Sequence, residues 1–396
     1  QKLKPGTLMP DLLHGMDAEK KSESVEALRH YLMTLSPGTA REAAMIGSSV
    51  EGKKLYHSLG CAQCHAPDAR DNGRDIPLGE LRAKYTHANL IKFLRDPLHS
   101  RPAGRMPRTP MSEEEAAHLS VYLRHRLKPL DLHGLSRGPA VLKLQQEGAK
   151  LYQTLRCANC HQSPKLDVQP AFSKPLTEVN PQHGCLAPKP VASVPHFHLN
   201  AAQRAAITAA LQAKPAAPTL LSKTHRQLRL LNCTACHDRK ALGQPDAQRD
   251  ELFLGLGEDL GDEGRRPPTL TGVGAKLTEP ALHQVLRGNG AVRPYLATRM
   301  PDFGEAHAKQ LTQLLAAADA RADVKPTPRH GNENKVGRNK YGRDLMGVKG
   351  LNCITCHQLA GRKSLGIQAL DLASAPARLR PEWFRDYLIN PAAFRP

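Results

Sequence analysis

The sequence predicts an all-α protein built of tandem helical domains, with long irregular loops and little β structure. Apolar residues recur three and four positions apart in many short stretches, which is the period of an amphipathic helix. The 32 prolines and 30 glycines are enough for long loops, yet too few to indicate wholesale disorder. One short cysteine motif also occurs four times, each time after a similar helical stretch, which indicates a tandem array.

Helical stretches are predicted on both sides of the cysteine motifs. Those before the motifs fall within residues 50–60, 146–156, 224–232 and 336–352. Those further along include residues 201–211 and 305–318, and a capping signal at Ser112 and Glu115 predicts the start of another. Linkers are expected at residues 36–39, 127–139, 214–218 and 324–334, which are rich in proline, glycine and polar residues.

The composition bounds the class of protein. A chain of 396 residues is long enough for two to four domains. It has no apolar run of the roughly 18–20 residues that a transmembrane helix requires, so no transmembrane segment is expected. The 56 basic and 37 acidic side chains leave a formal net charge of +19. Such an excess suggests nucleic acid, an anionic membrane surface or an acidic protein partner, and the cysteines decide among these.

Eight of the nine cysteines lie in four copies of the pattern Cys-x-x-Cys-His. This pattern is the attachment signature of c-type haem, in which two thiols add to the porphyrin vinyl groups and the histidine binds the iron. Chance would produce the pattern about 0.01 times in a chain of this composition. The thiol pairs are Cys61 and Cys64, Cys157 and Cys160, Cys233 and Cys236, and Cys353 and Cys356, and the proximal histidines are His65, His161, His237 and His357.

A zinc site, a redox dithiol and a disulfide framework fit the cysteine pattern less well than haem attachment does. A zinc ribbon would pair two motifs about 15–20 residues apart, whereas the first cysteines here are 96, 76 and 120 residues apart (157 − 61, 233 − 157, 353 − 233). A redox dithiol would not recur four times. Cys185 is left over, which excludes a disulfide framework. It is interpreted as a small buried residue in a turn, with an unusual iron ligand or a reactive thiol as the alternative.

The second half of two repeats carries a further motif. Arg105-Met106-Pro107 and Arg299-Met300-Pro301 each precede a predicted helix. The order helix, haem motif, helix, Met-Pro loop, helix resembles class I cytochrome c over nearly the whole chain. The finer pattern is similar to the tandem domains of large secreted multihaem proteins of planctomycete-type bacteria.

This resemblance implies distal iron ligands. Met106 and Met300 stand where the thioether ligand of a class I cytochrome c lies, with Met111 as the alternative for the first haem. Met9 has the same Met-Pro context but no haem motif of its own, so its partner is unidentified. In the second repeat Val194 replaces the methionine, and His196 or His198 is expected to bind the iron instead. His183, Cys185 or an open coordination site remain alternatives there.

The repeats predict five segments. The first and last segments are incomplete as domains. The first resembles the C-terminal tail of a domain without its haem motif, and the last ends where a Met-Pro loop is expected. Either the chain is part of a longer polypeptide, which we favour, or its N-terminal tail completes the fourth site. The first segment is residues 1–37. The other four are the first repeat at 48–128 (haem 1), the divergent second repeat at 140–214 (haem 2), the third repeat at 222–320 (haem 3) and the fourth repeat at 334–396 (haem 4).

The predicted function is electron transfer between redox partner proteins through four covalently bound haems. A haem enzyme, such as a c-type peroxidase or the cytochrome portion of a dehydrogenase with an open second haem, is the alternative. Nucleic-acid binding is not expected, because no helix-turn-helix or aromatic–basic strand pattern is present.

The resemblance implies a periplasmic, cell-surface or extracellular location. About eight haem propionates would offset part of the charge, and the rest favours acidic docking surfaces on the partners. Partners further include additional domains of a longer chain or other subunits.

Overall fold

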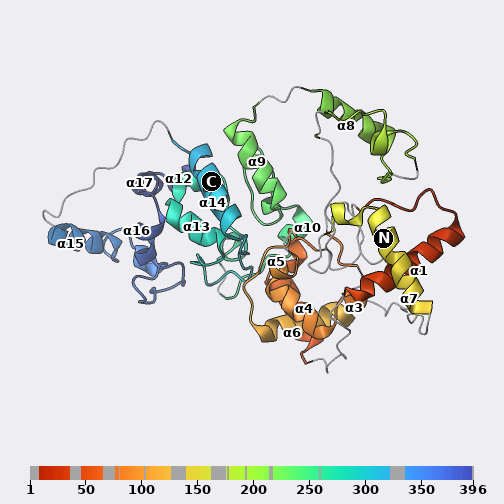
Figure 1. The fold of residues 1–396 in the computed structure, drawn as a ribbon. Coiled ribbons are helices and arrows are strands. Elements are labelled where there is room, and N and C mark those ends of the chain that lie inside the picture. Colours follow the sequence, from red (N-terminus) through yellow and green to blue (C-terminus); the bar gives the residue numbers. More distant parts are fainter. Residues whose placement is uncertain are drawn as a thin grey trace. The chain divides into compact units, whose positions relative to one another are not determined.

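A computed structural model covers residues 1–396 (Figure 1). It describes residues 9–35, 46–65, 76–79, 81–101, 104–125, 140–161, 175, 178–191, 194–213, 217–257, 260–321 and 335–394. Within these ranges the regular structure is helical and β pairing is limited to isolated bridges, so the all-α prediction is confirmed. The predicted linkers at 36–39, 127–139 and 324–334 lie outside the described residues, as does most of 214–218.

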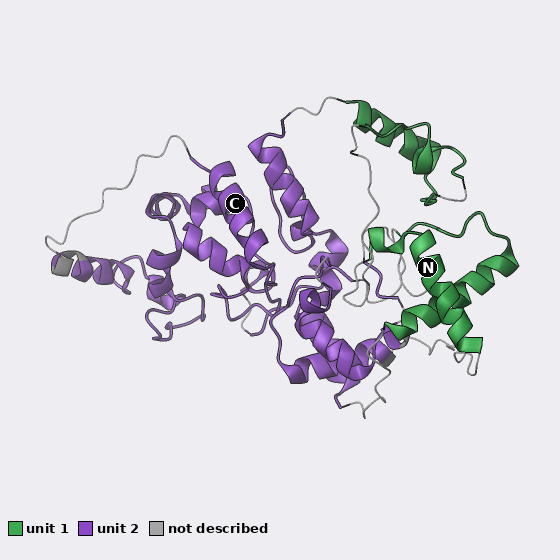
Figure 2. Ribbon diagram, viewed as in Figure 1, with its two compact units in different colours: residues 1–42, 129–216 green, residues 43–128, 217–396 purple. Residues whose placement is uncertain are grey.

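The chain forms two compact units, each drawn from two stretches of sequence (Figure 2). Unit 1 comprises residues 1–42 and 129–216, and therefore carries the second cysteine motif. Unit 2 comprises residues 43–128 and 217–396, and carries the first, third and fourth motifs.

Unit 1 is organised around one pair of crossing helices. Helix α1 (Ala18–Thr34) packs on α7 (Ala140–Thr154), and Tyr31 and Tyr152 meet at the crossing with ring centroids 5.6 Å apart. A Cβ added to Gly148 would collide with the carbonyl of Ala27, so only glycine permits this close approach. The unit continues through η2 (Cys157–Asn159), η4 (Gly184–Leu186) and α8 (Ala201–Gln212), close to the helix predicted there.

The first repeat of unit 2 contains the same kind of crossing. Helix α2 (Ser49–Ser58) packs on α6 (Glu113–His125), and Tyr56 and Tyr122 lie 5.6 Å apart, with Gly52 against the carbonyl of His118. Between them come η1 (Cys61–Gln63), α3 (Leu81–Lys84), α4 (His87–Arg95) and α5 (Pro97–Ser100). The predicted cap of α6 is confirmed, because Ser112 and Glu115 exchange hydrogen bonds of 2.8 and 3.1 Å.

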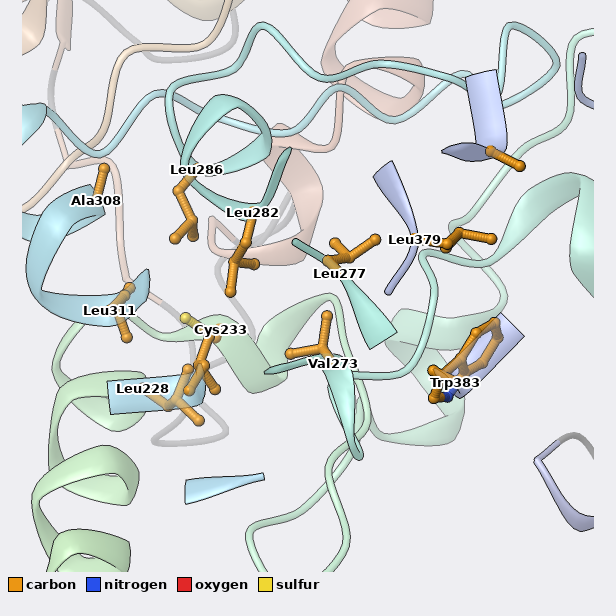
Figure 3. Packing of buried hydrophobic residues seen from close by; sticks show 12 residues of the cluster. Leu228, Cys233, Val273, Leu277, Leu282, Leu286, Ala308, Leu311, Leu379 and Trp383 are labelled. Carbon is orange, nitrogen blue, oxygen red and sulfur yellow. The ribbon is translucent and has the colours of Figure 1, made fainter. Parts of the chain in front are cut away.

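The third repeat supplies the largest apolar cluster, shown in Figure 3. Leu228, Leu311 and Leu315 are fully buried where α9 (Leu220–Leu230) meets α14 (Glu305–Ala318), the latter with the predicted bounds. The repeat also contains η5 (Cys233–Ala235), α10 (Ala247–Asp250), α11 (Asp262–Arg265), α12 (Val273–Lys276) and α13 (Glu279–Leu286).

The fourth repeat joins this cluster through its C-terminal part. Leu379 and Trp383 are buried in the same cluster as Leu277, and the chain pairs there as Thr278 N–H to Arg378 O at 2.8 Å. Its elements are α15 (Lys335–Met346), η6 (Cys353–Thr355), η7 (Leu372–Ser374), α16 (Ala375–Arg378), α17 (Pro381–Ile389) and η8 (Pro391–Ala393).

The close approach of α2 and α6 predicts that a methyl group added at the crossing destabilises the protein, whereas one added at a helical glycine outside the crossing does not. Gly52→Ala places a Cβ against the His118 carbonyl and should destabilise the crossing by about 1–3 kcal/mol. Gly342→Ala is the matched control, since a Cβ there meets nothing within 4 Å and alanine favours a helix. Hydrogen exchange should therefore accelerate in α2 and α6 for the first variant, and should not accelerate in α15 for the second. Equal exchange in both variants would contradict the role of Gly52.

Candidate haem-attachment sites

The four cysteine motifs, numbered here as sites 1 to 4 in chain order, fold into the same short turn. In each, the histidine N–H donates to the carbonyl of the first cysteine, at 3.0, 2.9, 3.0 and 2.9 Å. The residue before the first cysteine adopts a left-handed backbone in all four. These residues are Gly60, Arg156, Asn232 and Asn352, with φ angles of 91°, 54°, 55° and 59°.

That left-handed residue is a part of the site which the sequence analysis missed. Glycine and asparagine tolerate this conformation better than other residues, because glycine lacks a Cβ and asparagine bonds locally. Three of the four motifs carry one of them directly before the first cysteine, and that was the available signal. Arg156 is the exception, so site 2 holds its turn at a conformational cost of about 1–2 kcal/mol.

Three motif histidines are held by a carbonyl on one ring nitrogen. The Nδ1 atoms of His65, His237 and His357 lie 2.8, 2.6 and 3.1 Å from the carbonyls of Ile76, Pro268 and Leu370 respectively. Because a carbonyl only accepts, each Nδ1 carries the hydrogen. The lone pair is then on Nε2, as a proximal iron ligand requires.

Two tyrosines tie the motifs to the helices that precede them. The Tyr56 hydroxyl donates to the His65 carbonyl at 2.6 Å, and that of Tyr152 donates to the His161 carbonyl at 3.2 Å. Both tyrosines are almost wholly buried in the helix crossings of their repeats. The crossing therefore fixes the position of the histidine backbone in sites 1 and 2.

The environment of three thiols in sites 1 and 3 suits a neutral sulfur. Burial, with a smaller contribution from the charge of Cys64, raises the pKa of Cys61 to about 12. Burial likewise raises the pKa of Cys233 to about 12. Burial also holds the pKa of Cys236 well above its usual range. A thiolate is disfavoured in such a place, whereas a thioether carries no charge. The residues of sites 1 and 3 therefore fit a covalently attached haem.

In unit 2 the predicted methionines lie on the same cores as the thiols. Met106 packs against the cluster around Leu90 and Leu119, which Cys61 also contacts, and the alternative Met111 packs there too. Met300 packs against the cluster that contains Cys233. Sites 1 and 3 thus each bring a thiol and a candidate thioether ligand to one core. Site 4 retains Cys353, Cys356 and His357 on its turn.

In unit 1 the candidate ligands for site 2 gather on loops. His14 lies 5.1 Å from His196 between ring centroids, and His196 lies 4.1 Å from His198. Asp11, two residues after Met9, pairs with His196 through backbone hydrogen bonds of 2.9 and 3.1 Å. Met9 is 59 % exposed, and the described residues contain no group of three or more His, Cys, Asp or Glu side chains arranged to hold a metal ion. Cys185 lies half-buried on η4.

The first and third repeats touch at their attachment turns and Met-Pro loops. The Asn232 side-chain amide donates to the Cys64 sulfur at 3.6 Å. Arg299 makes two bonds to the Glu115 carboxylate, at 2.9 and 2.7 Å. The hydrogen bonds from Arg299, opposed in part by burial, hold the pKa of Glu115 below its usual range.

Comparison with known proteins identifies one part of the chain. Residues 49–126, which span α2 to α6, match the family model described as Cytochrome c. The searches of curated proteins and of solved structures found no match. The stretch is thus a cytochrome c domain, a class that holds c-type haem covalently and transfers electrons. None of the described helices combines the length and apolar character needed to cross a membrane.

Proposed function

We propose that the chain is a multihaem c-type cytochrome that carries electrons between redox partner proteins through four covalently bound haems. The observation that carries the proposal is the repetition of one turn, with its left-handed residue and histidine-to-cysteine bond, at all four motifs. The cytochrome c domain contains only the first of them. The proposal extends its chemistry to a tandem array with the five segments predicted above. The resemblance to multihaem proteins of planctomycete-type bacteria belongs to the same proposal.

The side chains of the array would act by holding and screening the redox groups. Each thiol pair would anchor one haem, and at sites 1, 3 and 4 the carbonyl on Nδ1 would orient the histidine toward iron. Haem iron supplies the reversible one-electron chemistry. Met106 and Met300 would complete sites 1 and 3 and raise their potentials, whereas His196 or His198 at site 2 would give a lower one. Met9 remains a candidate ligand on the same loops of unit 1.

The net charge of +19 supports a choice of partner. Covalent haem would add about eight propionates, so part of the basic excess is balanced by the cofactors and the rest attracts acidic surfaces. We therefore propose acidic docking surfaces on the electron donor or acceptor, with an interaction that weakens as salt rises. Further domains or other subunits are proposed as additional partners. Haem attachment supports a periplasmic, cell-surface or extracellular location.

The count of four haems makes a prediction about thiols. If every motif is loaded, the eight motif cysteines are thioethers and only Cys185 stays free. Alkylation of the denatured holoprotein should then modify one residue, and peptide mass spectrometry should find it at Cys185. Cys185→Ala is the control and should take up no label. Label on any motif cysteine would show that site to be empty and would reduce the haem count.

The methionine assignments predict which variants change the spectrum. Met106→Ala and Met300→Ala should each remove part of the near-infrared thioether-to-iron band and lower the potential of one haem, because thioether ligation raises it. Met111→Ala is the matched control, as this residue packs on the same cluster as Met106. The band should persist in the control. A band of unchanged intensity in both test variants would refute the two assignments.

A haem enzyme is the second candidate, favoured by Val194 in the place of a methionine at the second repeat. An enzyme of this kind needs an open iron at site 2. Site 4 has no assigned distal ligand, so the measurement uses Cys353→Ala with Cys356→Ala, which removes haem 4. The electron-carrier proposal expects carbon monoxide to leave the spectrum of this reduced variant unchanged. Met106→Ala opens site 1 and serves as the positive control. A carbon monoxide complex in the variant without haem 4, with Met106 and Met300 in place, would favour the enzyme instead.

A further inference from the structure

The Met-Pro loops of the first and third repeats lie antiparallel to each other in unit 2. Arg108 N–H donates to the Asp302 carbonyl at 3.1 Å, and Asp302 N–H donates back to Arg108 at 2.8 Å. Each residue stands two positions after the candidate ligand of its own repeat, Met106 or Met300. Their side chains add an ion pair of 3.0 Å. Equivalent positions therefore face each other, as in a local two-fold arrangement.

The attachment turns of the same two repeats also meet. Asn232, which directly precedes Cys233, donates its side-chain amide to the Cys64 sulfur at 3.6 Å. Gln63, between the two thiols of site 1, is fully buried and donates to the Arg249 carbonyl of the third repeat at 3.1 Å. The backbone of Gly60 lies close enough to Thr298 that an added Cβ would be 2.9 Å from its methyl group.

These contacts fix where two haem edges would be. A c-type haem is bonded to its cysteine sulfurs, so the thioether edge of each porphyrin follows the sulfur positions. The Cys64 sulfur touches the residue next to Cys233, and so both thioether edges belong to one junction. Sites 1 and 3 are 172 positions apart in the chain (233 − 61), with site 2 between them. Neighbours in space are therefore not neighbours in sequence.

We propose, on the basis of the proposed function, that the haems of sites 1 and 3 form a directly coupled pair across the Cys64–Asn232 junction. One electron passes from the ferrous to the ferric member of the pair, no bond is made or broken, and a redox partner protein supplies or removes the electron. Tunnelling weakens steeply with the distance between edges, which makes this pair the fast internal step. Charge on one member also acts on the other through a poorly screened junction.

Removal of one haem at a time tests the pair in the full chain. Cys233→Ala with Cys236→Ala removes haem 3, and Cys353→Ala with Cys356→Ala removes haem 4 as the matched control. Low-temperature electron paramagnetic resonance of the oxidised proteins should show a broadened haem 1 signal in the unmodified protein and in the variant without haem 4. The broadening should be absent in the variant without haem 3. The potential of haem 1 should fall in the same variant, because an oxidised neighbour raises it by repulsion.

The reciprocal variant keeps the test decisive if the third repeat fails to fold without its haem. Cys61→Ala with Cys64→Ala should shift the potential of haem 3 by the same amount, since coupling between two sites is reciprocal. A haem 1 signal and potential that are identical with and without haem 3 would overturn the pairing. Mass spectrometry of each protein counts the haems. If each variant holds three reducible haems but no coupling between haems 1 and 3 is detected, only the pair is refuted. Absence of haem would refute the proposed function itself.

Discussion

Every attachment site depends on one left-handed residue directly before its first cysteine. Because that residue reverses the chain at the end of a helix, the next five residues close on themselves and the histidine N–H reaches the first cysteine carbonyl. The two thiols and the imidazole then emerge from one rigid turn. Gly60, Asn232 and Asn352 adopt this backbone at little cost, whereas Arg156 does not. The proposed covalent attachment therefore depends on a backbone conformation outside the motif itself.

The helix crossing behind the turns of sites 1, 2 and 3 is the second constraint, and it involves the residue nine positions before the first cysteine. Gly52 and Gly148 hold this position in sites 1 and 2, and both lie against a carbonyl of the crossing helix. Thr224 holds it in site 3, fully buried, with its hydroxyl bonded to the Leu220 carbonyl at 2.9 Å. Since threonine carries the Cβ that the glycines lack, α9 and α14 must cross in a different manner.

The sequence predicted what is local, and it missed what depends on distant partners. The helical period predicted α14 with its observed bounds and the Ser112–Glu115 cap, because both arise within a few residues. The carbonyl partners of the histidines lie 11, 31 and 13 residues downstream, so no fixed spacing could reveal them. The packing of α1 on α7 joins stretches more than a hundred residues apart, and loop closure over such lengths leaves no periodic signal.

The Met-Pro loop has two separate properties in the structure. Its backbone pairs with another loop, and its methionine side chain is a candidate iron ligand. In unit 2 the residues two positions after Met106 and Met300 pair through their backbones, and in unit 1 those after Met9 and Val194 pair in the same way. Proline has no N–H, so the pairing begins only at the residue that follows it. None of these bonds uses the methionine side chain. A valine at 194 therefore keeps the loop contact while it removes the sulfur, and under the proposed function the change at site 2 affects the iron rather than the fold.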